Sequence, residues 1–74
     1  PVEPAEPLPR RLQRHARTVE QHLGACRCRA ARDAQAELLK AAGRKGQSTY
    51  AANLARLDEA IVRACETVGA GCNK

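Results

Sequence analysis

The sequence lacks phenylalanine, tryptophan and methionine, and Tyr50 is its single aromatic residue. Among its 74 residues, leucine, valine and isoleucine together number only twelve, whereas alanine alone numbers fifteen. So few large apolar side chains cannot enclose a substrate-sized cavity, which excludes a TIM barrel, a dinucleotide-binding fold and most stand-alone enzymes. There is also no run of about 18 apolar residues, so the sequence predicts no membrane-spanning helix.

Known catalytic and cofactor-binding motifs are absent as well. The sequence contains no nucleophile turn with a matching histidine and aspartate, no glycine-rich phosphate loop and no zinc-protease signature. The Cys26-Arg27-Cys28 pair does not have the C-x-x-C spacing of redox enzymes. We therefore expect a protein that is not an enzyme, has no catalytic residues and needs no cofactor.

The residues that are present favour helices held together by sulfur. Abundant alanine without large aromatics is typical of helices rather than strands. A chain this short needs disulfides, a metal or oligomerisation to hold its fold, and an even number of cysteines favours two disulfides. These cysteines are Cys26, Cys28, Cys65 and Cys72. Because disulfides persist in oxidising compartments, we expect a periplasmic or secreted protein.

The first residue does not decide between export and other origins. The chain begins with proline rather than an initiator methionine, which a removed signal peptide or a trimmed sequence would explain, so export is inferred from the cysteines alone. Its alanine-rich usage, with arginine preferred over lysine, is typical of a GC-rich bacterial genome.

Composition divides the chain into an arm and a single helical domain. The arm contains four prolines, which restrain the backbone and remove amide donors, so we expect it to be extended. The expected parts are an arm over 1–9 and a domain over 10–74, with helices over about 10–42 and 48–68 and a tail over 69–74. Between the helices, Gly43 and Gly46 bound a charged loop, and Ser48 or Thr49 is expected to cap the second helix.

The first predicted helix is amphipathic, with arginines opposite its apolar face. That face comprises Leu8, Leu12, Ala16, Val19, Leu23, Cys26, Ala30, Ala34 and Ala41. Gly24 is its weak point, since an interior glycine costs about 1 kcal/mol relative to alanine. We favour a continuous helix because the apolar face continues in register through Gly24. In the alternative, the helix breaks near Gly24, which gives three helices and buries Leu39 in a different apolar face.

The second predicted helix has the more regular pattern. Its apolar face comprises Tyr50, Leu54, Leu57, Ile61, Ala64, Cys65 and Val68, and Gly69 and Gly71 end it. A short connection makes two helices antiparallel neighbours. The sequence therefore predicts an all-α, disulfide-stapled antiparallel helical hairpin, with the three-helix arrangement as its alternative.

Hairpin geometry also predicts which cysteines pair. Cys26 and Cys65 lie at the same level on facing stripes, so we expect a Cys26–Cys65 bridge, which leaves Cys28–Cys72. The competing pairing joins Cys28 to Cys65 and Cys26 to Cys72, and a helix broken near Gly24 favours it. Closing a loop of about 40 residues stabilises the fold by roughly 3–4 kcal/mol.

Positive charge is concentrated in one third of the chain, where seven arginines between residues 10 and 32 face Glu20 alone. Such a field attracts acidic partners, so we expect an exported adaptor, inhibitor or accessory protein that binds an acidic protein. The expected partner-binding residues are Arg10, Arg11, Arg14, Arg17, Arg29 and Arg32. Nucleic acid is not expected, because no aromatics are interleaved with these arginines for base stacking.

Two other functions remain as alternatives. A basic amphipathic helix can contact anionic membranes, as in secreted membrane-active effectors. His15, His22 and Cys26 lie on one flank of the first helix at spacings of seven and four, a pattern that suits a small metal carrier. Because a cysteine cannot both bridge and ligate, the favoured disulfides predict no metal site.

A two-helix unit of this composition leaves part of its apolar surface exposed. A twofold dimer that forms a four-helix bundle would bury this surface. We therefore expect a homodimer.

Overall fold

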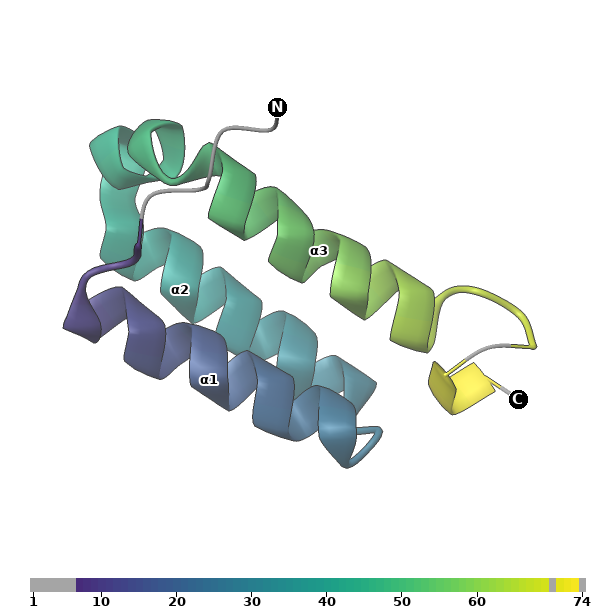
Figure 1. Cartoon of the computed structure of the whole chain (residues 1–74). Helices are drawn as coiled ribbons and strands as arrows, with labels where there is room; N and C mark the ends of the chain where they lie inside the picture. Colours follow the sequence, from purple (N-terminus) through teal and green to yellow (C-terminus); the bar gives the residue numbers. More distant parts are fainter. Residues whose placement is uncertain (1–6, 70, 74) are drawn as a thin grey trace.

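The structure is a computed structural model that describes residues 7–69 and 71–73. These residues form three α-helices and no strand. The elements in order are α1 (Arg10–Gly24), α2 (Cys28–Thr49), α3 (Ala51–Cys65) and a short 3-10 turn η1 (Gly71–Asn73). The chain runs out along α1, returns along α2 and runs out again along α3 (Figure 1). An all-helical protein is thus confirmed, while most of the predicted proline-rich arm, residues 1–6, lies outside the described residues.

The predicted continuous first helix is wrong, because the chain turns between α1 and α2. The amide of Cys26 donates to the carbonyl of Leu23 at 3.0 Å, and that of Arg27 donates to His22 at 2.8 Å. These two bonds make a Schellman motif, which ends a helix with one left-handed residue. That residue is Cys26, with a φ of 57°. The alternative break near Gly24 is therefore the correct one, although the left-handed residue lies two positions further on.

The corner between α2 and α3 also differs from the predicted loop. Gly43, with φ 71° and ψ 178°, interrupts α2, but the chain then resumes a helical course to Thr49. Neither predicted cap acts on α3, which has no side-chain cap bond. The Thr49 hydroxyl instead donates to the carbonyl of Lys45 at 3.0 Å, within the preceding turn. A helix thus fills most of the segment for which the sequence predicted a loop.

The second predicted helix is shorter than expected at both ends. It begins at Ala51 and ends at Cys65, where the amide of Glu66 still donates to the carbonyl of Val62 at 2.8 Å. Val68, assigned to the apolar face, lies beyond the helix and is 92% exposed. The chain after Cys65 therefore leaves the helix, and residues 71–73 lie against the end of α3 instead of extending it.

The core lies where α1 and α3 pack against α2. Its buried members are Leu12, Val19, Ala31, Leu38, Leu57 and Ile61. The residues from α1 and α3 belong to the faces that the sequence predicted. Ala31 and Leu38, however, lie on α2 outside the apolar face predicted for the continuous helix. Breaking the helix rotates α2 about its axis, so a different set of side chains faces the core.

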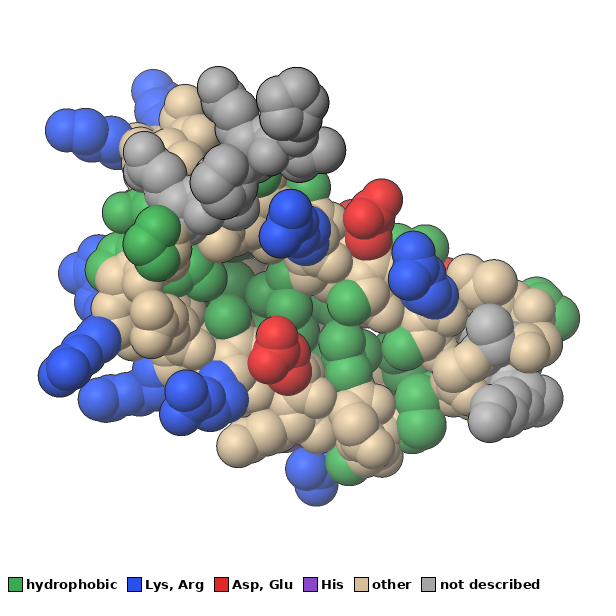
Figure 2. Space-filling view, viewed as in Figure 1, with side chains coloured by type: hydrophobic (Ala, Val, Ile, Leu, Met, Phe, Trp, Pro, Cys, Tyr) green, Lys and Arg blue, Asp and Glu red, His purple; other side chains and the backbone are tan. Residues whose placement is uncertain are grey.

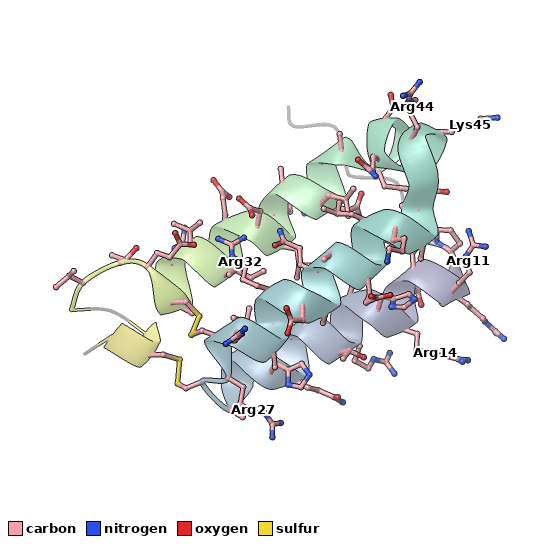
Figure 3. The ribbon with its side chains drawn as sticks, turned by 180° about the vertical axis from the view of Figure 1, so that it is seen from behind. Arg11, Arg14, Arg27, Arg32, Arg44 and Lys45 are labelled. Carbon is pink, nitrogen blue, oxygen red and sulfur yellow. A yellow bond between two sulfur atoms is a disulfide. The ribbon has the colours of Figure 1, made fainter. Side chains whose placement is uncertain are left out.

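Both disulfides lie at one end of the molecule and join the partners of the competing prediction (Figure 3). Cys26 bonds to Cys72, with their Cα atoms 5.4 Å apart, and Cys28 bonds to Cys65, with their Cα atoms 5.9 Å apart. The predicted Cys26–Cys65 and Cys28–Cys72 bridges are therefore wrong. The Schellman turn removes Cys26 from the helical face, and Cys28, in the first turn of α2, takes the position opposite the end of α3.

The C-terminal tail reaches Cys26 because Gly71 passes very close to α3. A Cβ atom placed on Gly71 would lie 2.6 Å from the Cα of Ala64, and its φ is 54°. Both the contact and the backbone conformation therefore require glycine here. This close passage lets the tail fold back over α3 and bring Cys72 to the α1–α2 turn.

Candidate interaction surface

Four of the six predicted partner-binding arginines lie on α1. Arg10, Arg14 and Arg17 repeat at helical spacing and, with Gln13, line one shallow hollow. All three are exposed, and none forms an ion pair with another described residue. The side of α1 away from the core therefore presents a row of unneutralised guanidinium groups.

Arg11 points to a second hollow, between the start of α1 and the α2–α3 corner. Its Nη2 donates to the carbonyl of Ala41 at 3.3 Å, which directs the side chain across α2. Lys45 lines the same hollow from the helical turn that follows Gly43. The apolar residues Leu12, Ala42 and Tyr50 also line it. The fold thus joins two cations from distant parts of the sequence to an apolar patch.

We call the combined cations of α1 and the α2–α3 corner the basic surface. Its members are Arg10, Arg11, Arg14, Arg17, Arg44 and Lys45. Figure 2 shows blue side chains gathered at this end of the molecule, and Figure 3 shows Arg11, Arg44 and Lys45 at the same end. Arg44 and Lys45 were not predicted to bind a partner. The sequence does show these two adjacent cations between Gly43 and Gly46. Only the fold of the α2–α3 corner, however, brings them to the same end of the molecule as the start of α1.

Arg32, also predicted to bind a partner, is engaged inside the protein instead. Its Nη1 donates to Asp58 Oδ1 at 2.8 Å and to Gln35 Oε1 at 2.8 Å, and its Nη2 pairs with Glu66. Gln35 Nε2 donates to the same Asp58 oxygen at 2.9 Å. This network joins α2 to α3 and neutralises Arg32, so Arg32 does not belong to the basic surface.

The network also changes the acidity of its members. The hydrogen bonds from Gln35 and Arg32 hold the pKa of Asp58 below its ordinary value. The hydrogen bonds to Asp58 and Glu66 raise the pKa of Arg32 further, because they stabilise the charged guanidinium. Both groups therefore remain charged at neutral pH.

The last predicted partner-binding residue, Arg29, lies in the first turn of α2 and is exposed. This turn is at the disulfide end of the molecule, next to Arg27 (Figure 3). Arg29 and the basic surface are thus at opposite ends of α2. The six predicted arginines do not form a single face, because the break after Gly24 reverses the chain between Arg17 and Arg29.

The three residues of the metal alternative are not available together. Cys26 is bonded to Cys72, so its sulfur is not a free ligand. Nδ1 of His22 is buried without a hydrogen-bond partner among the described residues. No group of three or more His, Cys, Asp or Glu side chains suited to a metal occurs in the part of the chain that the structure describes. A carrier that uses Cys26 as a ligand is therefore incompatible with this disulfide.

Likeness to known proteins assigns no function to this surface. Among the described helices, none is both long enough and apolar enough to cross a membrane. The chain matches no family model, no curated protein and no solved structure. The two disulfides are compatible with an oxidising extracellular environment.

Proposed function

We propose that the protein is an exported, non-enzymatic interaction protein whose basic surface binds an acidic protein partner. The observation that carries this proposal is the hollow in which Arg11 and Lys45 stand beside the apolar side chains of Leu12 and Tyr50. Two cations at an apolar patch suit a segment in which carboxylates neighbour aliphatic side chains. We place Arg29 and Arg32 outside this interface.

The position of the cations on α1 supports a role in binding. Arg10 and Arg11 occupy the first turn of α1, which contains no acidic residue. The amino end of a helix carries a partial positive charge, so cations there destabilise the helix by about 0.3–1 kcal/mol each. Helix stability therefore does not explain these two arginines, whereas attraction of an acidic partner does.

The membrane alternative is less well supported by the packing of α1. Membrane insertion requires a free apolar face on an amphipathic helix. Leu12 and Val19, the large residues at the centre of that face, are 1% and 0% exposed because they pack in the core. Contact with anionic lipid would thus rest on charge alone unless the fold opened.

Export follows from the same framework of disulfides. In a reducing cytosol both bonds would be lost, and with them about 4 kcal/mol of stabilisation each in the chain-entropy model. With only six buried core residues among those that the structure describes, the fold has little stability to replace that loss. We therefore place the protein in the periplasm or outside the cell.

The proposal is tested with a synthetic acidic peptide as the probe. A fluorescein-labelled peptide of glutamate, aspartate and leucine is titrated with the protein, and anisotropy reports binding. We expect binding that weakens as salt rises from about 50 to 300 mM, because screening reduces attraction between the charges. A peptide with glutamine and asparagine in place of the acids should not bind.

Two charge-reversal variants separate the basic surface from net charge. Arg14→Glu with Lys45→Glu changes the basic surface, and Arg27→Glu with Arg29→Glu changes the disulfide end. Each pair lowers the net charge from +5 to +1. We expect the first pair to weaken binding at least about tenfold and the second to have little effect. Equal losses in both variants would mean that only net charge matters, and the proposal would then fail.

A further inference from the structure

A third hollow, of about 250 Å³, lies between α1 and α3 on the face shown in Figure 2. Its apolar lining comes from all three helices and includes Ala16, Leu38, Leu54, Leu57 and Ala60. We call it the α1–α3 groove. Figure 2 shows green side chains along this face between the two outer helices. Apolar hollows on a protein surface are candidate interaction sites.

The groove exists because α1 and α3 both pack on α2 and leave space between themselves. Alanines stand on both walls, Ala16 on α1 and Ala60 on α3, and their small side chains cannot fill it. Leu38 and Leu57 close its floor, and both belong to the core. The groove therefore reaches down to the hydrophobic core.

The charges on the groove identify the kind of occupant. Glu20 stands on the α1 wall and Arg56 on the α3 wall, and both are exposed. Neither forms an ion pair with another described residue. One acid and one base in a single groove do not select a strongly acidic or strongly basic ligand. They suit a surface that carries the same two charges in reversed order.

We propose that the face containing this groove packs against the same face of a second copy of this chain, so that the two grooves lie opposite one another. In a twofold dimer, α1 of each copy lies against α3 of the other. Glu20 of one copy then faces Arg56 of its partner, and the pair occurs twice, as an isologous interface requires. This surface differs from the basic surface, so the inference is independent of the proposed function.

The interface is expected to be weak. Each copy carries a net charge of +5, so long-range repulsion opposes association. We therefore expect sedimentation velocity to show monomers at low protein concentration and dimers as the concentration rises from about 10 µM towards 1 mM. A strict monomer over this range would overturn the inference.

The first pair of variants tests the location of the interface. Ala60→Arg puts a long charged side chain into the groove, while Ala36→Arg adds the same charge at an exposed position of α2 that does not line it. Ala60→Arg should abolish the dimer, and Ala36→Arg should leave it almost unchanged. Circular dichroism confirms that both variants fold. A dimer that survives Ala60→Arg would place the interface elsewhere and contradict the proposal.

A charge swap tests the self-complementary pairing. Glu20→Arg and Arg56→Glu each make like charges face one another and should weaken the dimer at least about tenfold. The double variant restores opposite charges with the original net charge, and it should recover the dimer. If repulsion between copies were the only electrostatic effect, Arg56→Glu would strengthen association because it lowers the net charge to +3, starting from +5. That result, or a failure of the double variant to recover, would overturn the pairing.

Discussion

Gly24 and Gly71 both lie near turns of this chain, but their surroundings differ. Gly24 ends α1 with an ordinary negative φ, and nothing lies within 4 Å of a Cβ atom placed on it. Gly71 combines a φ of 54° with a passage 2.6 Å from the Ala64 backbone. Glycine is thus dispensable at the first position and required at the second.

These environments predict opposite effects of alanine. Gly24→Ala should stabilise the protein by about 0.5–1 kcal/mol, because alanine favours the helix and meets no atom. Gly71→Ala should destabilise it, because the tail must move away from α3. Urea unfolding followed by circular dichroism measures both. A loss of stability in Gly24→Ala would show that the turn depends on glycine there.

Asp58 makes the stability of the protein sensitive to acid. Its pKa is lowered from the ordinary 3.8 by hydrogen bonds from Gln35 and Arg32. A carboxyl whose pKa is lower in the folded state contributes stability above its unfolded pKa. That contribution is lost as the pH falls through the lower folded pKa. The relevant window therefore lies below about pH 4.

We expect Asp58→Asn to be less stable than the parent protein at pH 7 and to approach it as the pH falls below about 4. The measurement is the unfolding midpoint in urea at several pH values for both proteins. Asp33→Asn, at an exposed position of α2 outside this network, serves as the matched control. Parallel pH profiles for the parent and Asp58→Asn would rule out this network as the source of acid sensitivity.

At the scale of the helices, the positive charge at the start of α1 lowers the stability of that helix. Its first turn carries Arg10 and Arg11 where an acidic residue would be favourable. The helix keeps its position because Leu12 and Val19 are buried against α2, not because its amino end is stabilised. Its face away from α2 is left free for charge.

Arg10→Glu should therefore change stability and binding in opposite directions. We expect an increase in the free energy of unfolding of about 0.3–1 kcal/mol, from a favourable interaction with the helix dipole. Binding of the acidic peptide should weaken at the same time. Thermal unfolding and fluorescence anisotropy measure the two quantities. Tighter peptide binding would remove Arg10 from the basic surface.

For the whole molecule, cross-linking is confined to one end. The two disulfides join the α1–α2 turn and the start of α2 to the tail and the end of α3 (Figure 3). They close segments with separations of 46 and 37 residues, so the chain-entropy model assigns about 4 kcal/mol to each. The two disulfides differ in backbone conformation, since Cys26 has a left-handed backbone and the other three cysteines do not.

Removal of the two disulfides should not be equally costly. Glycine adopts the conformation of Cys26 without the roughly 1–2 kcal/mol penalty of a side chain. Cys26→Gly with Cys72→Ala should therefore destabilise the protein less than Cys28→Ala with Cys65→Ala, by about 1 kcal/mol. Chemical unfolding of both double variants under non-reducing conditions tests the order. The reverse order would show that the Cys26–Cys72 bridge contributes more to the free energy of unfolding than the Cys28–Cys65 bridge does.

The sequence by itself determined the helical class, the two disulfides and the faces that α1 and α3 bury. Alanine content, cysteine number and helical periodicity are local properties, and Leu12, Val19, Leu57 and Ile61 carry them plainly. The sequence also offered the break near Gly24 as an alternative. Periodicity could not choose between a continuous and a broken helix, because the apolar residues keep their helical spacing through Gly24 whether or not the helix breaks there.

Only the tertiary structure decided the disulfide pairing and the composition of the basic surface. A left-handed residue at Cys26 reverses the chain, rotates α2 and gives Cys28 the place opposite Cys65. The same reversal separates Arg29 from the arginines of α1, and the turn after Gly43 brings in Lys45 instead. One backbone angle redirects every residue that follows it, and spacing along the chain does not record that angle.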